Sequence, residues 1–67
     1  MPFVTDPRGR SWGQITEDLR DLRAAVDLFK KRFQAAGRNE VAENLEECIL
    51  MLLGAEAAAK ALDLEGR

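Results

Sequence analysis

The residues with the most chemistry to offer are four glutamates that stand close together in the chain. Glu43 with Glu46 or Glu47 would share one face of a helix, where paired carboxylates can hold a divalent cation or share a proton. Helix-bundle sites that bind two metals also use histidine, and the chain has none. Glutamates near a helix N-terminus are favoured by the helix dipole alone. We therefore interpret these residues as solvated and predict no metal, no cofactor and no enzymatic activity: Glu40, Glu43, Glu46 and Glu47.

A second charged group is basic and could contact phosphates. Its members are expected around the end of a helix, where they could form a stripe facing nucleic acid: Lys30, Lys31, Arg32 and Arg38. The glutamates lie at the same end and can neutralise this group, and the net charge of the whole chain is −2. An RNA- or DNA-binding regulator is therefore an alternative to the main prediction.

The only cysteine, Cys48, cannot form a disulfide within the chain. With no histidine to act as its base, it is expected to be a buried structural thiol. A chain without disulfides suits a reducing, cytoplasmic setting. The most apolar run, residues 48–55, is far shorter than the roughly 20 residues that cross a bilayer, so no membrane span is expected.

Two helices are expected to position these groups. Ser11 and Gln14 have the spacing of a capping box, which predicts a first helix over about residues 12–36 that stops at a left-handed Gly37. Asn39 is expected to cap a second helix over about residues 40–63. Residues 1–10 are expected to be an extended lead-in with a turn at Asp-Pro-Arg-Gly.

Apolar residues recur in steps of three and four along both helices, which is typical of a bundle seam. The short connection makes the two helices antiparallel, so the seams are expected to face each other within one all-α domain over residues 11–67. The predicted hairpin core is Trp12, Ile15, Leu19, Leu22, Val26, Phe29, Phe33 and Val41, and the seam of the second helix continues through Leu45, Cys48, Leu52, Ala55, Ala59 and Leu62.

The middle of the second helix is apolar around almost its whole circumference, more than one neighbouring helix can cover. The hairpin is therefore predicted to pair with itself as a dimer or tetramer, in a four-helix bundle or a coiled-coil-like oligomer. The expected interface is Leu45, Cys48, Ile49, Leu50, Met51, Leu52 and Leu53. The predicted function is that of a small non-enzymatic interaction or regulatory protein whose bundle binds another macromolecule, most simply a protein. A helical subunit of a heteromeric complex is a further alternative.

Overall fold

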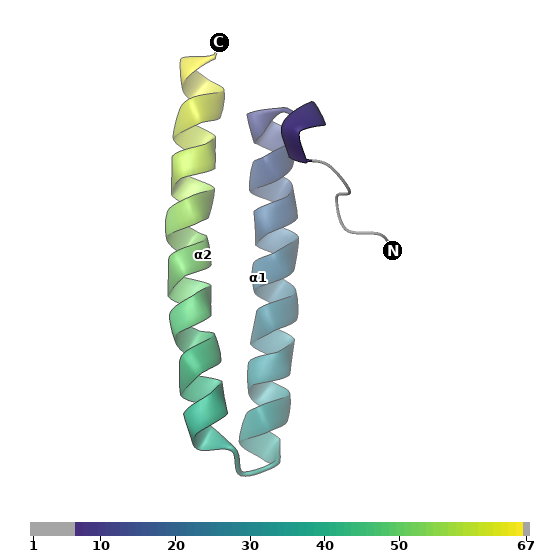
Figure 1. Ribbon diagram of the computed structural model, residues 1–67, viewed down its shortest axis with the longest axis vertical. Helices are drawn as coiled ribbons and strands as arrows, with labels where there is room; N and C mark the ends of the chain where they lie inside the picture. Colours follow the sequence, from purple (N-terminus) through teal and green to yellow (C-terminus); the bar gives the residue numbers. More distant parts are fainter. Residues whose placement is uncertain (1–6, 67) are drawn as a thin grey trace.

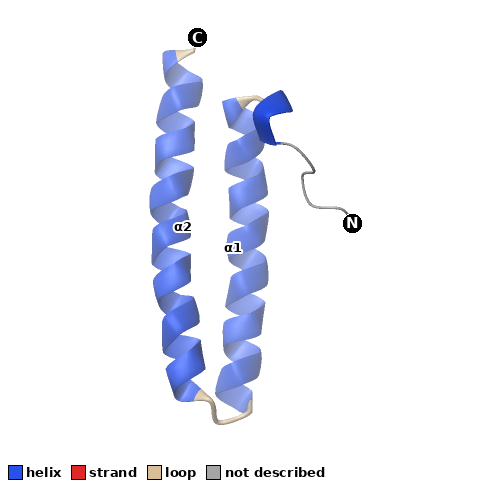
Figure 2. Cartoon of the chain, viewed as in Figure 1, coloured by secondary structure: helices blue, strands red, loops and turns tan. Residues whose placement is uncertain are grey.

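A computed structural model describes residues 7–66, and within that range the chain is an all-α hairpin without strands (Figures 1 and 2). A short 3-10 helix, η1 (Pro7–Gly9), precedes α1 (Trp12–Ala35) and α2 (Asn39–Glu65). The two long helices lie side by side and run antiparallel, which confirms the predicted all-α antiparallel hairpin (Figure 1). Of the expected lead-in, η1 takes up the last three residues of the Asp-Pro-Arg-Gly turn, and Asp6 lies outside the described residues.

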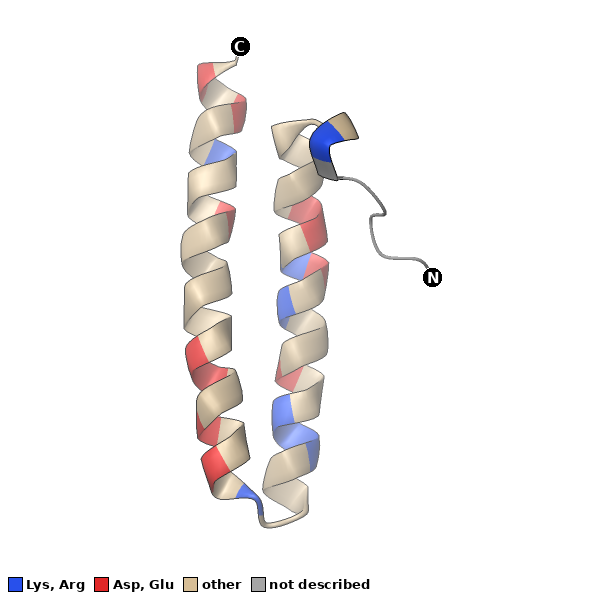
Figure 3. Ribbon diagram, viewed as in Figure 1, with Lys and Arg blue, Asp and Glu red and all other residues tan. Residues whose placement is uncertain are grey.

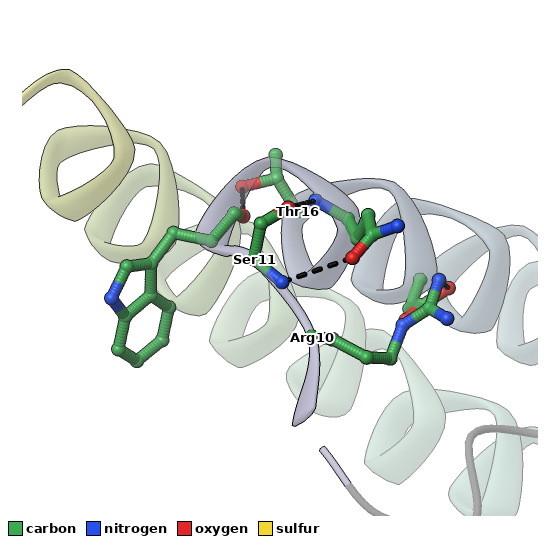
Figure 4. Close-up of polar contacts among 6 residues, drawn as sticks. Arg10, Ser11 and Thr16 are labelled. Carbon is green, nitrogen blue, oxygen red and sulfur yellow. Dashed lines mark hydrogen bonds and ion pairs between the residues drawn. The ribbon is translucent and has the colours of Figure 1, made fainter. Parts of the chain in front are cut away.

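Side chains at its N-terminus define the start of α1, as the sequence predicts. The Gln14 N–H donates to Ser11 Oγ over 3.2 Å, and the Ser11 N–H donates to Gln14 Oε1 over 3.0 Å. This is the predicted capping box (Figure 4). The Arg10 guanidinium adds an ion pair with Asp18, with Nε and Oδ2 2.7 Å apart. Arg10 and Ser11 are therefore fixed to the first two turns of the helix.

The turn between the helices is tight because Gly37 adopts φ +78°, as predicted. The Arg38 N–H donates to the Phe33 carbonyl over 2.9 Å and the Gly37 N–H to the Gln34 carbonyl over 3.0 Å, the paired bonds of a Schellman motif. The expected Asn39 cap is not formed. Asn39 is already the first residue of α2, and Arg38 precedes it without a side-chain capping bond. The turn is so short that no residue remains for a side-chain cap.

Two glycine substitutions should have opposite effects on stability. Gly37→Ala is expected to lower the free energy of unfolding by about 1–2 kcal/mol, because a Cβ at positive φ approaches the following carbonyl oxygen. Gly54→Ala is expected to raise it by about 0.5–1 kcal/mol, because Gly54 lies inside α2 and nothing lies within 4 Å of an added Cβ. Urea denaturation at one fixed protein concentration measures both, and a stable Gly37→Ala would contradict the first expectation.

The surface buried between α1 and α2 is small and partly polar. Ala42 and Ala59 are each 3% exposed, and the other buried residues are Thr16 and Glu56. The Thr16 hydroxyl is satisfied because it donates to the Trp12 carbonyl over 2.8 Å (Figure 4). Among the described residues no large side chain is fully buried. The two helices therefore approach each other on small residues, and among the described residues the fully buried apolar core is limited to two alanines.

The hairpin is a single layer of helix. The longest principal extent is 46 Å, and the shortest, 13 Å, is close to the ~10–12 Å diameter of one helix with its side chains. The radius of gyration of 13.9 Å exceeds the ~11 Å expected of a compact domain of this length. Stable domains pack at least two layers around a shared core. Within residues 7–66 the hairpin consequently lacks the second layer that a core requires.

Candidate interaction surface

In α2, the apolar stripe and the buried column are offset by one residue. The buried or half-buried column follows Ala42, Ile49 and Glu56, which are seven residues apart and point in nearly the same direction. Val41 and Cys48 precede this column by one position, and one residue turns a helix by about 100°. Cys48 is accordingly exposed, which differs from the buried thiol expected from the sequence.

The same offset occurs in α1. Thr16 and Arg23 lie in the column that faces α2, and Ile15, Leu22 and Phe29 belong to the stripe one residue earlier. Phe29 is 60% exposed. The predicted stripe exists in the sequence, but in the single chain it points partly to the side of the hairpin, because Ile15 and Leu22 are only half-buried and Phe29 is exposed.

Both stripes emerge on the same side of the hairpin. In each helix the stripe precedes the column that faces the other helix by one residue, so both stripes are rotated in the same sense about their own helix axis. Antiparallel helices are exchanged by a two-fold axis perpendicular to the plane that contains them. Rotation about that axis leaves the two sides of the plane unchanged. The predicted hairpin core therefore lies along one side of both helices in the single chain, where Ile15, Leu19, Leu22, Val26 and Val41 are half-buried and Trp12, Phe29 and Phe33 are exposed. We call it the open face: Trp12, Ile15, Leu19, Leu22, Val26, Phe29, Phe33, Val41, Leu45, Cys48, Leu52, Ala55 and Leu62, with the buried Ala59 at its inner edge.

The seven residues expected to form an oligomer interface do not share one surface. Leu45, Cys48 and Leu52 belong to the open face, and the half-buried Ile49 lies between the helices. Met51, 72% exposed, points away from α1. Two further leucines lie on the opposite side of α2 from the open face, where a third exposed leucine extends them into an outer stripe: Leu50, Leu53 and Leu64.

A buried carboxylate holds the middle of the hairpin together. Arg23 donates to Glu56 through Nε over 2.6 Å and through Nη2 over 3.3 Å, and Arg20 Nε lies 3.8 Å from the same carboxylate. The hydrogen bond with Glu56 raises the pKa of Arg23, and desolvation opposes that rise. Because a planar two-point pair tolerates little displacement, it fixes how far α1 can slide along α2.

Ion pairs near the turn engage half of the basic group considered for nucleic acid. Lys30 Nζ lies 2.7 Å from Glu46 Oε2, and Asp27 lies 3.6 Å from Lys30 and 3.2 Å from Lys31. The hydrogen bond with Glu46 raises the pKa of Lys30. Basic residues of α1 face acidic residues of α2 at this end of the hairpin (Figure 3). The remaining members of the group, Arg32 and Arg38, are exposed.

The pKa of Asp27 provides a direct test of this network. A hydrogen bond from Lys31 is the main reason that the pKa of Asp27 lies below its ordinary value. A carboxyl group whose pKa is lowered in the folded chain stabilises that chain when the pH is above its ordinary pKa. This contribution is lost as the pH falls through the lowered pKa. Lys31→Met is expected to raise the pKa of Asp27 towards normal with little change in stability, because the pair is exposed. Carbon-detected NMR titration measures this, and an unchanged pKa would contradict the assigned pair.

Other kinds of site receive little support from the described residues. Within residues 7–66, no group of three or more His, Cys, Asp or Glu side chains is placed to hold a metal ion. That same part of the chain contains no helix with the length and apolar character needed to cross a bilayer. In comparisons with known proteins, no family model, no curated protein and no solved structure matches the chain.

Proposed function

We propose that this chain is a small, non-enzymatic interaction protein that works as a homo-oligomeric helical bundle and binds another macromolecule. The observation that carries the proposal is the open face. Two full-length apolar stripes lie side by side, and between the helices no large side chain of the described residues is fully buried. An uncovered apolar surface of this extent marks an interaction site. A second hairpin laid on the open face would supply the missing layer and close a four-helix bundle.

The exposed area is consistent with one such partner. The chain exposes 5231 Å², about 1,000 Å² more than the ~4,200 Å² expected for a compact monomer of this mass. A standard protein interface removes about 800 Å² from each partner. The excess is therefore of the size that one dimer contact would remove. The lone cysteine would then lie inside the bundle, which suits a reducing, cytoplasmic setting.

The outer stripe offers a surface for a different protein. Leu50 and Leu64 are each 60% exposed and Leu53 is 42% exposed, and a second hairpin on the open face would leave all three uncovered. Apolar residues in helical spacing on an exposed helix suit docking against another helix or groove. A partner retained by the wild-type chain and lost by a Leu50→Asp, Leu53→Asp variant of unchanged mass would support this assignment.

Solution mass across a hundredfold dilution tests the proposal. Light scattering on a size-exclusion column is expected to give twice the chain mass of 7.5 kDa or a higher even multiple. A well-folded monomer at all concentrations would overturn the proposal. A poorly folded monomer would favour the heteromeric alternative, in which a helix of a different protein covers the open face. Steeply salt-dependent retention of RNA would favour the nucleic-acid alternative, and Lys31→Glu with Arg32→Glu should abolish it.

A further inference from the structure

We propose that two hairpins pair through their open faces with their turns at opposite ends of the bundle. The inference rests on the proposed self-association and adds its geometry. It follows from the register of α1 against α2, which three contacts fix. Arg23 is level with Glu56, and Lys30 is level with Glu46. An added Cβ at Gly13 would lie 3.5 Å from the carboxylate oxygens of Asp63, which aligns the other end.

Apart from Trp12 and Val41, which lie at its two ends, this register divides the open face into six successive levels, each with one residue from each helix. Bulky side chains gather towards the turn, and small ones gather in α2 towards the chain termini. From the termini to the turn the levels are Ile15 with Leu62, Leu19 with Ala59, Leu22 with Ala55, Val26 with Leu52, Phe29 with Cys48, and Phe33 with Leu45.

Turns at the same end would stack each level on its own copy. Two neighbouring layers would then each contain two alanines, from Ala55 and Ala59, while the layer nearest the turn would hold two copies of Phe33 and two of Leu45. Such a bundle is narrow in one half and crowded in the other. Because protein cores are packed to a nearly uniform density, this unevenness costs either voids or strain.

Turns at opposite ends pair the levels in reverse order. The level of Phe29 then lies on the level of Leu19 and Ala59 in the second copy, and the level of Leu22 and Ala55 lies on that of Leu52. No layer contains more than one alanine. Each level that contains an alanine lies on a level without one, so side-chain volume is spread more evenly along the bundle, as a uniformly packed core requires. The distribution of side-chain volume therefore favours this orientation.

Distances between spin labels in the full chain test the orientation. Arg38 in the turn and Glu65 at the end of α2 are both exposed, so cysteines there leave the open face intact. They would be introduced separately in a Cys48→Ala background whose dimeric mass has been checked. Pulsed dipolar measurements on Arg38→Cys and on Glu65→Cys are each expected to give a long distance, near the 46 Å length of the hairpin. Mixed dimers of the two variants are expected to give a short one, because Arg38 of one copy then lies at the same end of the bundle as Glu65 of the other.

The opposite pattern overturns the inference and leaves the proposed function standing. Short distances within each labelled variant, and a long distance in the mixed sample, would place both turns at one end. A dimer that gives both patterns at once would overturn a single orientation. Monomeric mass with no dipolar signal would overturn self-association itself, and the orientation with it.

Discussion

Phe29→Asp is expected to weaken self-association by at least about 100-fold in the dimer dissociation constant. Phe29 lies in the open face and is 60% exposed in the single chain, so the isolated hairpin can accept a carboxylate there. In a bundle the same carboxylate would be buried in an apolar layer without a partner, once in each copy. Analytical ultracentrifugation over a concentration series measures the change.

Leu50→Asp is the matched control for this substitution. Leu50 is also 60% exposed, and it lies in the outer stripe on the opposite side of α2. It is expected to keep the wild-type mass and dissociation constant. Dissociation by Leu50→Asp with retention of the dimer in Phe29→Asp would place self-association on the outer stripe. If both substitutions dissociate the dimer equally, self-association does not depend on one face alone.

Glu56→Ala is expected to lower the melting temperature by about 5–10 °C. Glu56 is only 9% exposed, and its loss leaves Arg23 facing the inside of the hairpin without its two-point partner. Removing one member of such a pair costs more than the pair itself contributes, because the Arg23 side chain, 32% exposed, is then only partly hydrated. Thermal unfolding followed by circular dichroism at fixed protein concentration measures the loss.

Replacing both members of this pair shows whether the pair stabilises the hairpin or only selects the alignment of α1 along α2. Arg23→Met with Glu56→Leu is expected to recover the wild-type melting temperature or exceed it, since the cost of desolvating two charges disappears. A double variant as unstable as Glu56→Ala would show that the ion pair itself stabilises the hairpin. If the stable double variant gives several spin-label distances where the wild-type chain gives one, the pair selects a single register of α1 against α2.

Much of the fold could be predicted because its signals are local. The capping box at Ser11 and the left-handed Gly37 each depend on residues within a few positions of one another, and the structure confirms both. The short turn then leaves antiparallel packing as the available arrangement. The expected Asn39 cap did not form because the Schellman turn extends to Arg38, directly before the helix.

The direction of the apolar stripes could not be predicted in the same way. Spacing of three and four residues shows that a stripe exists, but it does not identify the neighbour that the stripe faces. Columns one residue later have the same periodicity and carry Ala42, Arg23 and Glu56. Small residues that allow close approach, together with opposite charges at matching levels, were the signal for the helix contact. That signal is weaker than a run of leucines.

If the hairpin pairs with itself as proposed, the lack of a fully buried large side chain in residues 7–66 makes the folded state depend on the concentration of the chain. If most of the apolar burial occurs when two copies meet, the folded fraction and the melting temperature rise with protein concentration. Newly made chains below that concentration would expose both apolar stripes to proteases, whereas chains above it would be protected. The lifetime of the protein would then increase with its own abundance. Its steady-state concentration would rise steeply once the rate of synthesis passes a threshold, and would not simply be proportional to that rate.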